Sequence, residues 1–416
     1  MRISERRITL GWLVSAALVA ALAGCSSRTG TAPAGSAQPG SAPPVASTSG
    51  SSTSGPHGSA PAGGTGAGAR PPGGPVPAGF LARDFTFVSP DQGWLLGTAP
   101  CSSAPCTSIV RTTDGGRSWV GIPAPRADLE FNGQNGCDAD QACVRGLRFA
   151  DTRTGYAYGS TGLYLTRDGG ATWSRQPGQA DAVEVGDGTA LRVGHGTEGC
   201  PPGCGYQVST APVGGTQWQT VSLPGTLTGN AVQLLRVGHR AFLAVYRNTA
   251  GGAEDAHSTL VTSADDGGHW TLHSDPCGSQ GGQEADTTQL AAGPDGSLTV
   301  LCRVRQTGVG FVATSTDGGA SFGPAHRFPD GPVQAVGAAS ATVLLVSSGG
   351  NAYRSTDSGV SWTQVARAPF PSEGEVQPGV FGFQNAGTGR WVPGGAQVLT
   401  TTDGGRTWTT ATFGGS

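Results

Sequence analysis

The sequence predicts an all-β protein, a seven-bladed β-propeller with four-stranded antiparallel blades. Three observations lead to this prediction. A short turn motif recurs along the chain, its copies are spaced by about the length of four short strands, and no segment beyond the first 25 residues has the periodicity of an amphipathic helix. Repeats of 40 to 50 residues that contain four strands are typical of propeller blades.

The recurring motif consists of Ser or Thr, Asp two places on, Gly two places after that, and then Ser or Thr followed by Trp. Four copies fit fully, and two fit with one change each, because His269 replaces the second hydroxyl residue in one copy and Phe322 replaces Trp in another. We call these segments the repeated turns. Their acidic and aromatic residues are Asp114, Asp168, Asp265, Asp317, Asp357, Asp403, Trp119, Trp173, Trp270, Phe322, Trp362 and Trp408.

The spacing of the repeated turns reveals a seventh copy. Successive Asp residues lie 40 to 54 positions apart, except for a gap of 97 between Asp168 and Asp265. A copy that has lost its Asp lies in this gap and ends at Trp218. The 337 residues of 80–416 then divide into seven units of about 48. We expect each motif to form the turn between the third and fourth strands of its blade.

The Asp of each repeated turn is predicted to stabilise the fold rather than to catalyse or to bind calcium. An Asp at this place can accept hydrogen bonds from backbone N–H groups a few residues on, and Gly116 and its equivalents supply a backbone position with positive φ. The aromatic residue that follows is expected to pack as a large apolar wedge against the outer strands.

The motif resembles the Asp-box, also called the BNR repeat. Asp-boxes occur in sialidases, in the photosystem II assembly and stability factor family of seven-bladed propellers, and in some xyloglucan hydrolases. The resemblance covers residues 80–416 and implies a propeller. It does not imply one activity, because a single propeller scaffold carries many unrelated functions.

Residues 1–25 are predicted to be a bacterial lipoprotein signal. Arg2, Arg6 and Arg7 precede an apolar run of 15 residues, 8–22, which is too short for a typical membrane span. The run ends in Leu-Ala-Gly-Cys, which resembles the lipobox and implies that Cys25 is acylated. The chain is therefore expected at the cell membrane, lipid-anchored on the extracytoplasmic face. The paired Arg6 and Arg7 also resemble a twin-arginine signal, and the export route stays open.

Residues 26–79 are predicted to be a disordered tether. This segment consists almost wholly of Gly, Ser, Pro, Ala and Thr, without aromatic or acidic residues, so it cannot bury enough apolar surface to offset its ordering entropy. As a flexible coil it would span roughly 40 Å and would hold the propeller, residues 80–416, away from the membrane surface.

Eight cysteines remain after Cys25, and an even number in an exported chain favours disulfides. Local spacing pairs Cys101 with Cys106, Cys137 with Cys143 and Cys200 with Cys204, which leaves Cys277 and Cys302 for each other. A zinc site made from His195, Cys200 and Cys204 is the alternative, which an oxidising compartment disfavours. No metal and no other cofactor is expected.

The long loops of the predicted propeller are acidic. Because chain direction alternates within a blade, the loops between second and third strands share one face with the connections between blades. That face carries Asp128, Glu130, Asp138, Asp140, Glu254, Asp255, Asp275, Glu284, Asp286, Glu373 and Glu375. We predict an acidic binding face there, with Glu254, Asp255, Glu284 and Asp286 at its centre. The alternative is that these loops are only solvated surface.

Charge and motifs favour a binding protein over an enzyme. The net charge of −3 comes with no basic run in the propeller, so nucleic acid is not an expected partner. The Phe/Tyr-Arg-Ile-Pro motif of sialidases is absent from the sequence, as are zinc-protease and phosphate-loop motifs. We predict a monomeric, membrane-anchored, non-enzymatic binding or assembly module for a protein or glycan. The alternative is an exo-acting glycoside hydrolase, either sialidase-like or using two loop carboxylates such as Glu254 and Glu284.

Overall fold

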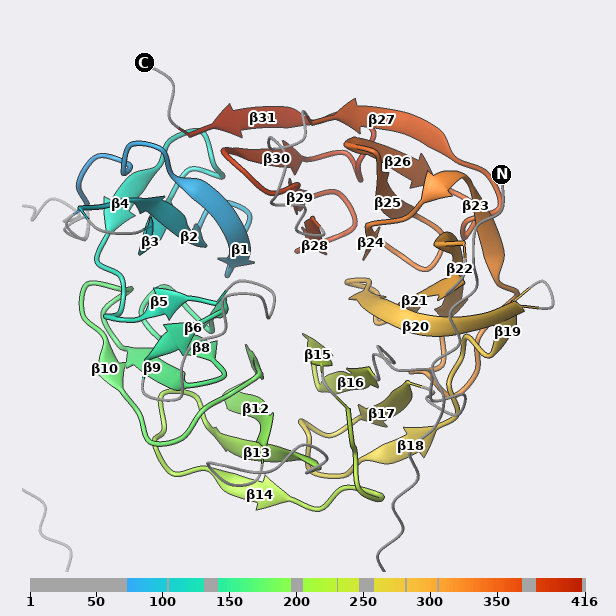
Figure 1. Cartoon of the computed structure of the whole chain (residues 1–416), viewed down its shortest axis with the longest axis horizontal. Helices are drawn as coiled ribbons and strands as arrows, with labels where there is room; N and C mark the ends of the chain where they lie inside the picture. The colour runs from blue at the N-terminus through green and yellow to red at the C-terminus, as the bar shows by residue number, and fades with distance from the viewer. Residues whose placement is uncertain are drawn as a thin grey trace, which may run out of the picture. The chain divides into compact units, whose positions relative to one another are not determined.

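Seven β-sheets surround a central axis, and each sheet forms one blade of a propeller (Figure 1). This arrangement confirms the predicted fold class. The computed structural model describes residues 73–102, 105–130, 141–195, 205–229, 231–246, 258–280, 283–304, 307–368 and 379–413. These residues belong to one compact unit, Ala67–Ser416. The predicted signal segment with Cys25, and most of the predicted tether, lie outside the described residues.

Every blade contains four antiparallel strands that are consecutive in the sequence. Blade one comprises β1 (Leu81–Phe87), β2 (Gly93–Pro100), β3 (Pro105–Thr112) and β4 (Val120–Ile122). Blade two comprises β7 (Gly146–Phe149), β8 (Gly155–Gly159), β9 (Gly162–Thr166) and β10 (Ser174–Arg175). Blade three comprises β11 (Ala182–Gly186), β12 (Thr189–His195), β13 (Tyr206–Pro212) and β14 (Gln219–Val221).

The remaining four blades continue the same order. Blade four comprises β15 (Ala231–Val237), β16 (Arg240–Tyr246), β17 (Thr259–Ser263) and β18 (Thr271–His273). Blade five comprises β20 (Gln283–Ala292), β21 (Leu298–Val304), β22 (Val309–Ser315) and β23 (His326–Pro332), with β19 (Ser279–Gln280) as an added edge strand. Blade six comprises β24 (Ala335–Ala338), β25 (Leu344–Ser348), β26 (Asn351–Ser355) and β27 (Thr363–Arg367). Blade seven comprises β28 (Val380–Phe383), β29 (Gly389–Val392), β30 (Gln397–Thr401) and β31 (Thr409–Thr412).

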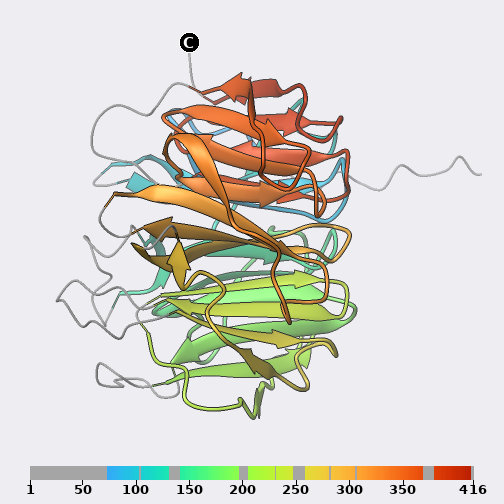
Figure 2. The same ribbon diagram turned by 90° about the vertical axis from the view of Figure 1, so that its right-hand side faces the viewer.

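The first strand of each blade lies nearest the axis and the fourth lies at the rim (Figure 1). The strands run between two faces of the ring (Figure 2). We call the face with the first-to-second and third-to-fourth turns the turn face, and the opposite face the loop face. A short parallel pair, β5 (Asp128–Leu129) and β6 (Cys143–Val144), joins blades one and two on the loop face. No helix in the described part of the chain has the length and hydrophobicity that a membrane crossing requires.

The hydrophobic core is divided into seven clusters, one between each pair of neighbouring blades. Each cluster contains one aromatic residue that follows a repeated turn, and that residue packs against the preceding blade. These residues are Trp119, Trp173, Trp218, Trp270, Phe322, Trp362 and Trp408. Each of these aromatic side chains thus packs its own blade against the preceding one.

The repeated turns are held by hydrogen bonds to the Asp carboxylate. In blade two, Oδ1 of Asp168 accepts from the Thr172 N–H at 2.8 Å and from the Thr166 hydroxyl at 2.8 Å, and Oδ2 accepts from the Thr172 hydroxyl at 2.6 Å. The other five acidic turns repeat this pattern, with the His269 imidazole in place of the hydroxyl in blade four. Hydrogen bonds from Ser361 lower the pKa of Asp357 to about 2. These carboxylates are occupied within their own turns.

Blade three keeps the turn without its acid. Val213 stands at the place of the Asp, and the turn closes through the Gly215 N–H, which donates to the Pro212 carbonyl at 2.7 Å. The Tyr156 hydroxyl from blade two accepts the Gly214 N–H at 2.7 Å. In the acidic turns the N–H at the same position donates to a backbone carbonyl instead, as Gly169 does to Arg153 at 2.8 Å.

Replacing Asp168 by Ala should lower the free energy of unfolding by about 1–3 kcal/mol, because turn N–H and hydroxyl groups lose their acceptor. Urea unfolding of the variant measures this cost. Asp168→Asn is the matched control, since its amide oxygen can still accept from the Thr172 N–H, and it should lose less stability. An Asp168→Ala protein as stable as the wild type would contradict the structural role.

Polar side chains on the innermost strands form hydrogen bonds to the neighbouring blade. Asp84 of β1 accepts the Leu147 N–H of β7 at 2.8 Å. In blade four, Gln233 accepts the Leu290 N–H of β20 at 2.7 Å and donates to the Leu290 carbonyl at 2.9 Å. In blade five, Gln289 accepts the N–H of the first strand of blade six at 2.8 Å. At these three junctions, side-chain hydrogen bonds thus join the innermost strands of neighbouring blades.

The ring closes without a shared strand, because all four strands of blade one come from the N-terminal end of the propeller and all four of blade seven from its C-terminal end. Ala82 instead donates its N–H to the Gly395 carbonyl at 2.8 Å. Phe80 and Phe413 pack edge to face with centroids 5.3 Å apart, and the Arg390 guanidinium lies 4.1 Å from the ring centroid of Phe87. We call this junction of blades seven and one the seam.

Candidate functional site

Two of the predicted disulfides lie on the loop face. Cys101 is bonded to Cys106 in blade one, and Cys277 is bonded to Cys302 in blade five. Both pairings are confirmed. Cys143 is also disulfide-bonded, while Cys137, Cys200 and Cys204 lie outside the described residues. One disulfide therefore closes the loop between β2 and β3, and the other joins the segment before β19 to β21.

The predicted acidic centre is described only in part. Glu254 and Asp255 lie outside the described residues. Glu284 and Asp286 both belong to β20, where Glu284 pairs with Ser279 and Asp286 stands opposite Arg303 of β21. The acidic binding face stays a prediction.

A different charged group lies between blades two and three on the loop face. Arg145, directly before β7, binds Glu130 through Nε, at 3.0 Å from Oε2, and through Nη2. The same Nη2 lies 3.5 Å from Oδ1 of Asp181, which directly precedes β11. His195, the last residue of β12, places Nδ1 3.2 Å from Oδ2 of Asp181. We call these four residues the loop-face cluster.

Burial and charge shift the pKa values of the two carboxylates of the loop-face cluster in opposite directions. Desolvation raises the pKa of both groups, and for Asp181 it prevails, so that its pKa is raised. For Glu130, the bond and charge of Arg145 and the donors of Ser160 outweigh desolvation, and its pKa is lowered. Oδ2 of Asp181 is buried and lies 3.2 Å from Nδ1 of His195, whose charge opposes part of the effect of desolvation on the pKa of Asp181.

The loop-face cluster exposes its nitrogen groups and buries its acids. The side chains of Arg145 and His195 are 34% and 33% exposed, against 15% for Glu130 and 7% for Asp181. Tyr206 lies behind the imidazole with ring centroids 4.4 Å apart, and burial raises its pKa to about 12. A partner would therefore meet a guanidinium and an imidazole, held in place by carboxylates beneath them.

A second charged group lies on the innermost strands of three blades. Arg148 of β7 lies between Asp84 of β1 and Glu184 of β11, at 2.9 Å from each. Although desolvation lowers the pKa of Arg148, the neighbouring Asp84 and Glu184 charges outweigh it and raise that pKa. One guanidinium therefore joins the innermost strands of three blades.

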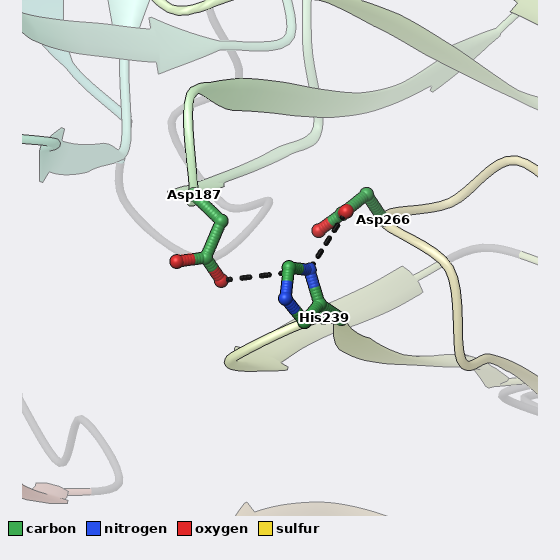
Figure 3. Close-up of side chains that lie close together, drawn as sticks. All are labelled: Asp187, His239 and Asp266. Carbon is green, nitrogen blue, oxygen red and sulfur yellow. Dashed lines mark hydrogen bonds and ion pairs between the residues drawn. The ribbon is translucent and has the colours of Figure 1, made fainter.

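A third group lies on the turn face between blades three and four (Figure 3). His239, in the turn before β16, places Nδ1 2.8 Å from Oδ2 of Asp266 and 3.9 Å from Oδ2 of Asp187. One ligand atom from each residue lies within 4.8 Å of the others, a spacing suited to a divalent cation. Beneath them, Arg236 is 2% exposed, is bonded to Oδ1 of Asp266 and lies 3.9 Å from Asp187. This guanidinium already pairs with Asp266, so we interpret the group as an ion-paired contact between blades.

The His239 contact predicts a pH dependence of stability. The bond to Asp266, followed by the charges of Asp266 and Asp187, raises the pKa of His239 above 6.5. The folded state then binds the proton more tightly than the unfolded state, so the stabilisation is complete below pH 6.5 and is lost as pH rises through the folded pKa. Urea unfolding of wild type and His239→Asn across this range should show the larger difference at the acidic end. A difference that grows with pH would contradict this interpretation.

From the sequence, Glu130 is expected among the loop acids and His195 only as an alternative zinc ligand, and nothing singles out Asp181 or Asp187. No sequence signal joins them, because Glu130 and Arg145 are 15 positions apart and Asp181 comes from another blade. The pairing of a charged residue directly before β7 with one directly before β11 is a signal that could have found part of the cluster.

Comparisons with known proteins identify the fold. No protein-family model and no curated protein matches the chain. Among solved structures, YCF48 bound to D1 peptide is 17% identical, covers 80% of this chain and 97% of that one, and has a TM-score of 0.51. An ancestral GH74 enzyme is 12% identical, with coverages of 82% and 47% and a TM-score of 0.52. An oligogalacturonate lyase in complex with manganese is 11% identical, with coverages of 82% and 98% and a TM-score of 0.51. At these identities the likeness concerns the fold alone, which binding proteins and enzymes share.

Proposed function

We propose that this chain is a propeller anchored to the cell membrane through Cys25, which binds a protein or glycan partner through its loop face and does not catalyse a reaction. The observation that carries the proposal is the position of Arg145. It contacts both carboxylates of the loop-face cluster and fills the space between them. The cluster thereby offers fixed donors to a partner rather than a pair of acids to a substrate.

A glycoside hydrolase uses the same residue types in a different arrangement. Its two carboxyl groups stand about 5–10 Å apart with the sugar between them, and at least one must reach the glycosidic oxygen. In the loop-face cluster a guanidinium occupies that space and Asp181 is buried. Within the described ranges, the geometry therefore favours binding. A hydrolase that uses the loop acids Glu254 and Glu284 is the alternative.

The likeness to YCF48 bound to D1 peptide supports this proposal by analogy. In that complex a propeller of this architecture accommodates a peptide. A loop face with disulfide-linked loops and ordered donors is suited to the same kind of ligand, because cross-linked loops lose less entropy on binding than free loops do.

The acidic loops separate binding from catalysis in one variant series. Changing Glu254, Asp255, Glu284 and Asp286 to their amides should slow association with Arg- and Lys-rich peptides and weaken its salt dependence, since such charges act mainly on the encounter rate. Asp91→Asn on the turn face is the control and should leave association unchanged. If instead Glu254→Gln alone abolishes cleavage of a glycoside panel, the chain is a hydrolase and the proposal is wrong.

The membrane anchor has its own test. Two or more acyl chains on Cys25 would give stable attachment where one would not. Cys25→Ser should therefore move the protein from the membrane fraction to the soluble fraction. A variant that stays with the membrane without an acyl label would refute the anchor and would leave the binding proposal intact.

A further inference from the structure

A polar groove of about 780 Å³ lies at the seam. The repeated turn of blade one forms one wall, and β31 with the turn before it forms the other. Val76 and Phe413, close to the two ends of the described chain, also line it. Small-molecule sites usually have volumes of 300–1,000 Å³, so the groove has the size of a ligand site.

The lining of the groove is rich in hydroxyl groups. Seven of its nineteen lining residues are threonines. The Thr407 hydroxyl is occupied by Asp403, whereas the hydroxyls of Thr400 and Thr409, which stand opposite each other on the blade-one side of β30 and β31, make no hydrogen bond to the rest of the described chain. A hydroxyl both donates and accepts. The wall formed by β30 and β31 therefore suits a ligand with several hydroxyl or carboxylate oxygens.

Arg390 contributes a buried positive charge to the groove. The residue is 1% exposed, and its Nη1 and Nη2 donate to the uncharged oxygens of Gln384 and Pro90, at 2.6 Å and 2.5 Å. Its Nε is buried and donates no hydrogen bond. Within the described ranges no carboxylate pairs with it. Desolvation lowers the pKa of Arg390 to about 10, against the charge of Asp91, so the group is still cationic at neutral pH.

Two acids also line the groove, and neither forms an ion pair with Arg390. Asp114 uses both carboxylate oxygens within its own turn, where Ser118 and Thr112 donate to it. Asp91 is exposed, so water and salt screen its field. A buried cation without a counter-ion acts through a lower dielectric and favours an anion nearby. Arg117 adds a second positive charge on the exposed rim.

We propose that the seam groove binds a hydroxylated carboxylate, a sugar acid or a short chain of sugar acids. The carboxylate would lie over Arg390, and the hydroxyls would meet Thr400 and Thr409. This site lies at the rim of the ring and is independent of the partner proposed for the loop face, so either can fail without the other.

Isothermal titration of the full chain with glucuronate, glucose and sulfate tests the proposal. Glucuronate should bind at least tenfold more tightly than glucose, because only glucuronate carries the charge, and more tightly than sulfate, because only glucuronate carries the hydroxyl groups. Arg390→Gln should weaken glucuronate binding at least tenfold.

Because Arg390 also supports the seam, a second variant keeps the test independent of folding. Thr400→Val with Thr409→Val removes two hydroxyls at nearly constant shape and should weaken glucuronate binding several-fold. Thr363→Val is the matched control, since Thr363 begins the outer strand β27 of blade six as Thr409 begins β31, and it should change nothing. The proposal is overturned if glucuronate does not bind, if glucose binds equally well, or if sulfate binds as tightly and ignores the threonine changes, which would mean an adventitious ion only.

Discussion

Replacing Arg148 by Met is expected to lower the free energy of unfolding by about 3 kcal/mol, because the change leaves two largely buried carboxylates without their cation. Asp84 and Glu184 are 13% and 14% exposed, and each lies 2.9 Å from the guanidinium. The value is at the lower end for a broken buried ion pair, since 22% of the Arg148 side chain is exposed. Urea unfolding followed by tryptophan fluorescence measures it.

The matched control removes the whole charged group. In the triple variant Asp84→Asn, Arg148→Met, Glu184→Gln, no unpaired charge is left in the wall, and the Asn side chain can still accept the Leu147 N–H that Asp84 accepts. Replacing a complete buried ion group by neutral residues is often close to neutral in stability. The triple variant should therefore be more stable than Arg148→Met alone. If the two are equally unstable, packing rather than charge explains the loss.

Removing the Cys277–Cys302 disulfide is the second large change, with an expected cost of about 3 kcal/mol. The bridge closes a loop of 25 positions, whereas Cys101–Cys106 closes one of 5, for which loop-closure entropy gives about 2 kcal/mol. Both cysteines of the longer bridge are buried in the cluster between blades four and five. The loss of their packing therefore adds to the loss of loop-closure entropy.

Paired Cys→Ala variants of the two bridges, unfolded in urea side by side, measure the comparison. Cys277→Ala with Cys302→Ala should have the lower midpoint. Cys101→Ala with Cys106→Ala is the matched control, since it also removes two cysteines but releases a shorter loop, and Cys101 and Cys106 are exposed. An equal loss from both bridges would show that loop length does not govern their contribution.

Local sequence signals were sufficient for the blades. Each repeated turn carries its own acceptor, its own glycine with positive φ and its own aromatic residue within eight positions, as Thr166, Asp168, Gly170 and Trp173 do in blade two. Interactions over so short a span do not depend on the rest of the fold. Counting them, with the degenerate copy at Trp218, therefore predicts the number of blades and the position of each third-to-fourth turn.

The residues that carry the candidate sites depended on the tertiary structure. Arg145 meets Asp181, Arg148 meets Asp84 and Glu184, and His239 meets Asp187 only because neighbouring blades pack at a particular angle and depth. The seam is the extreme case, since Arg390 donates to the Pro90 carbonyl 300 positions away. By itself the sequence determined the repeat, the strands and the local Cys101–Cys106 pairing, because short-range hydrogen bonding and spacing specify them. Which charges are buried together was decided by the closure of the ring, because desolvation and pairing depend on neighbours that come from other blades.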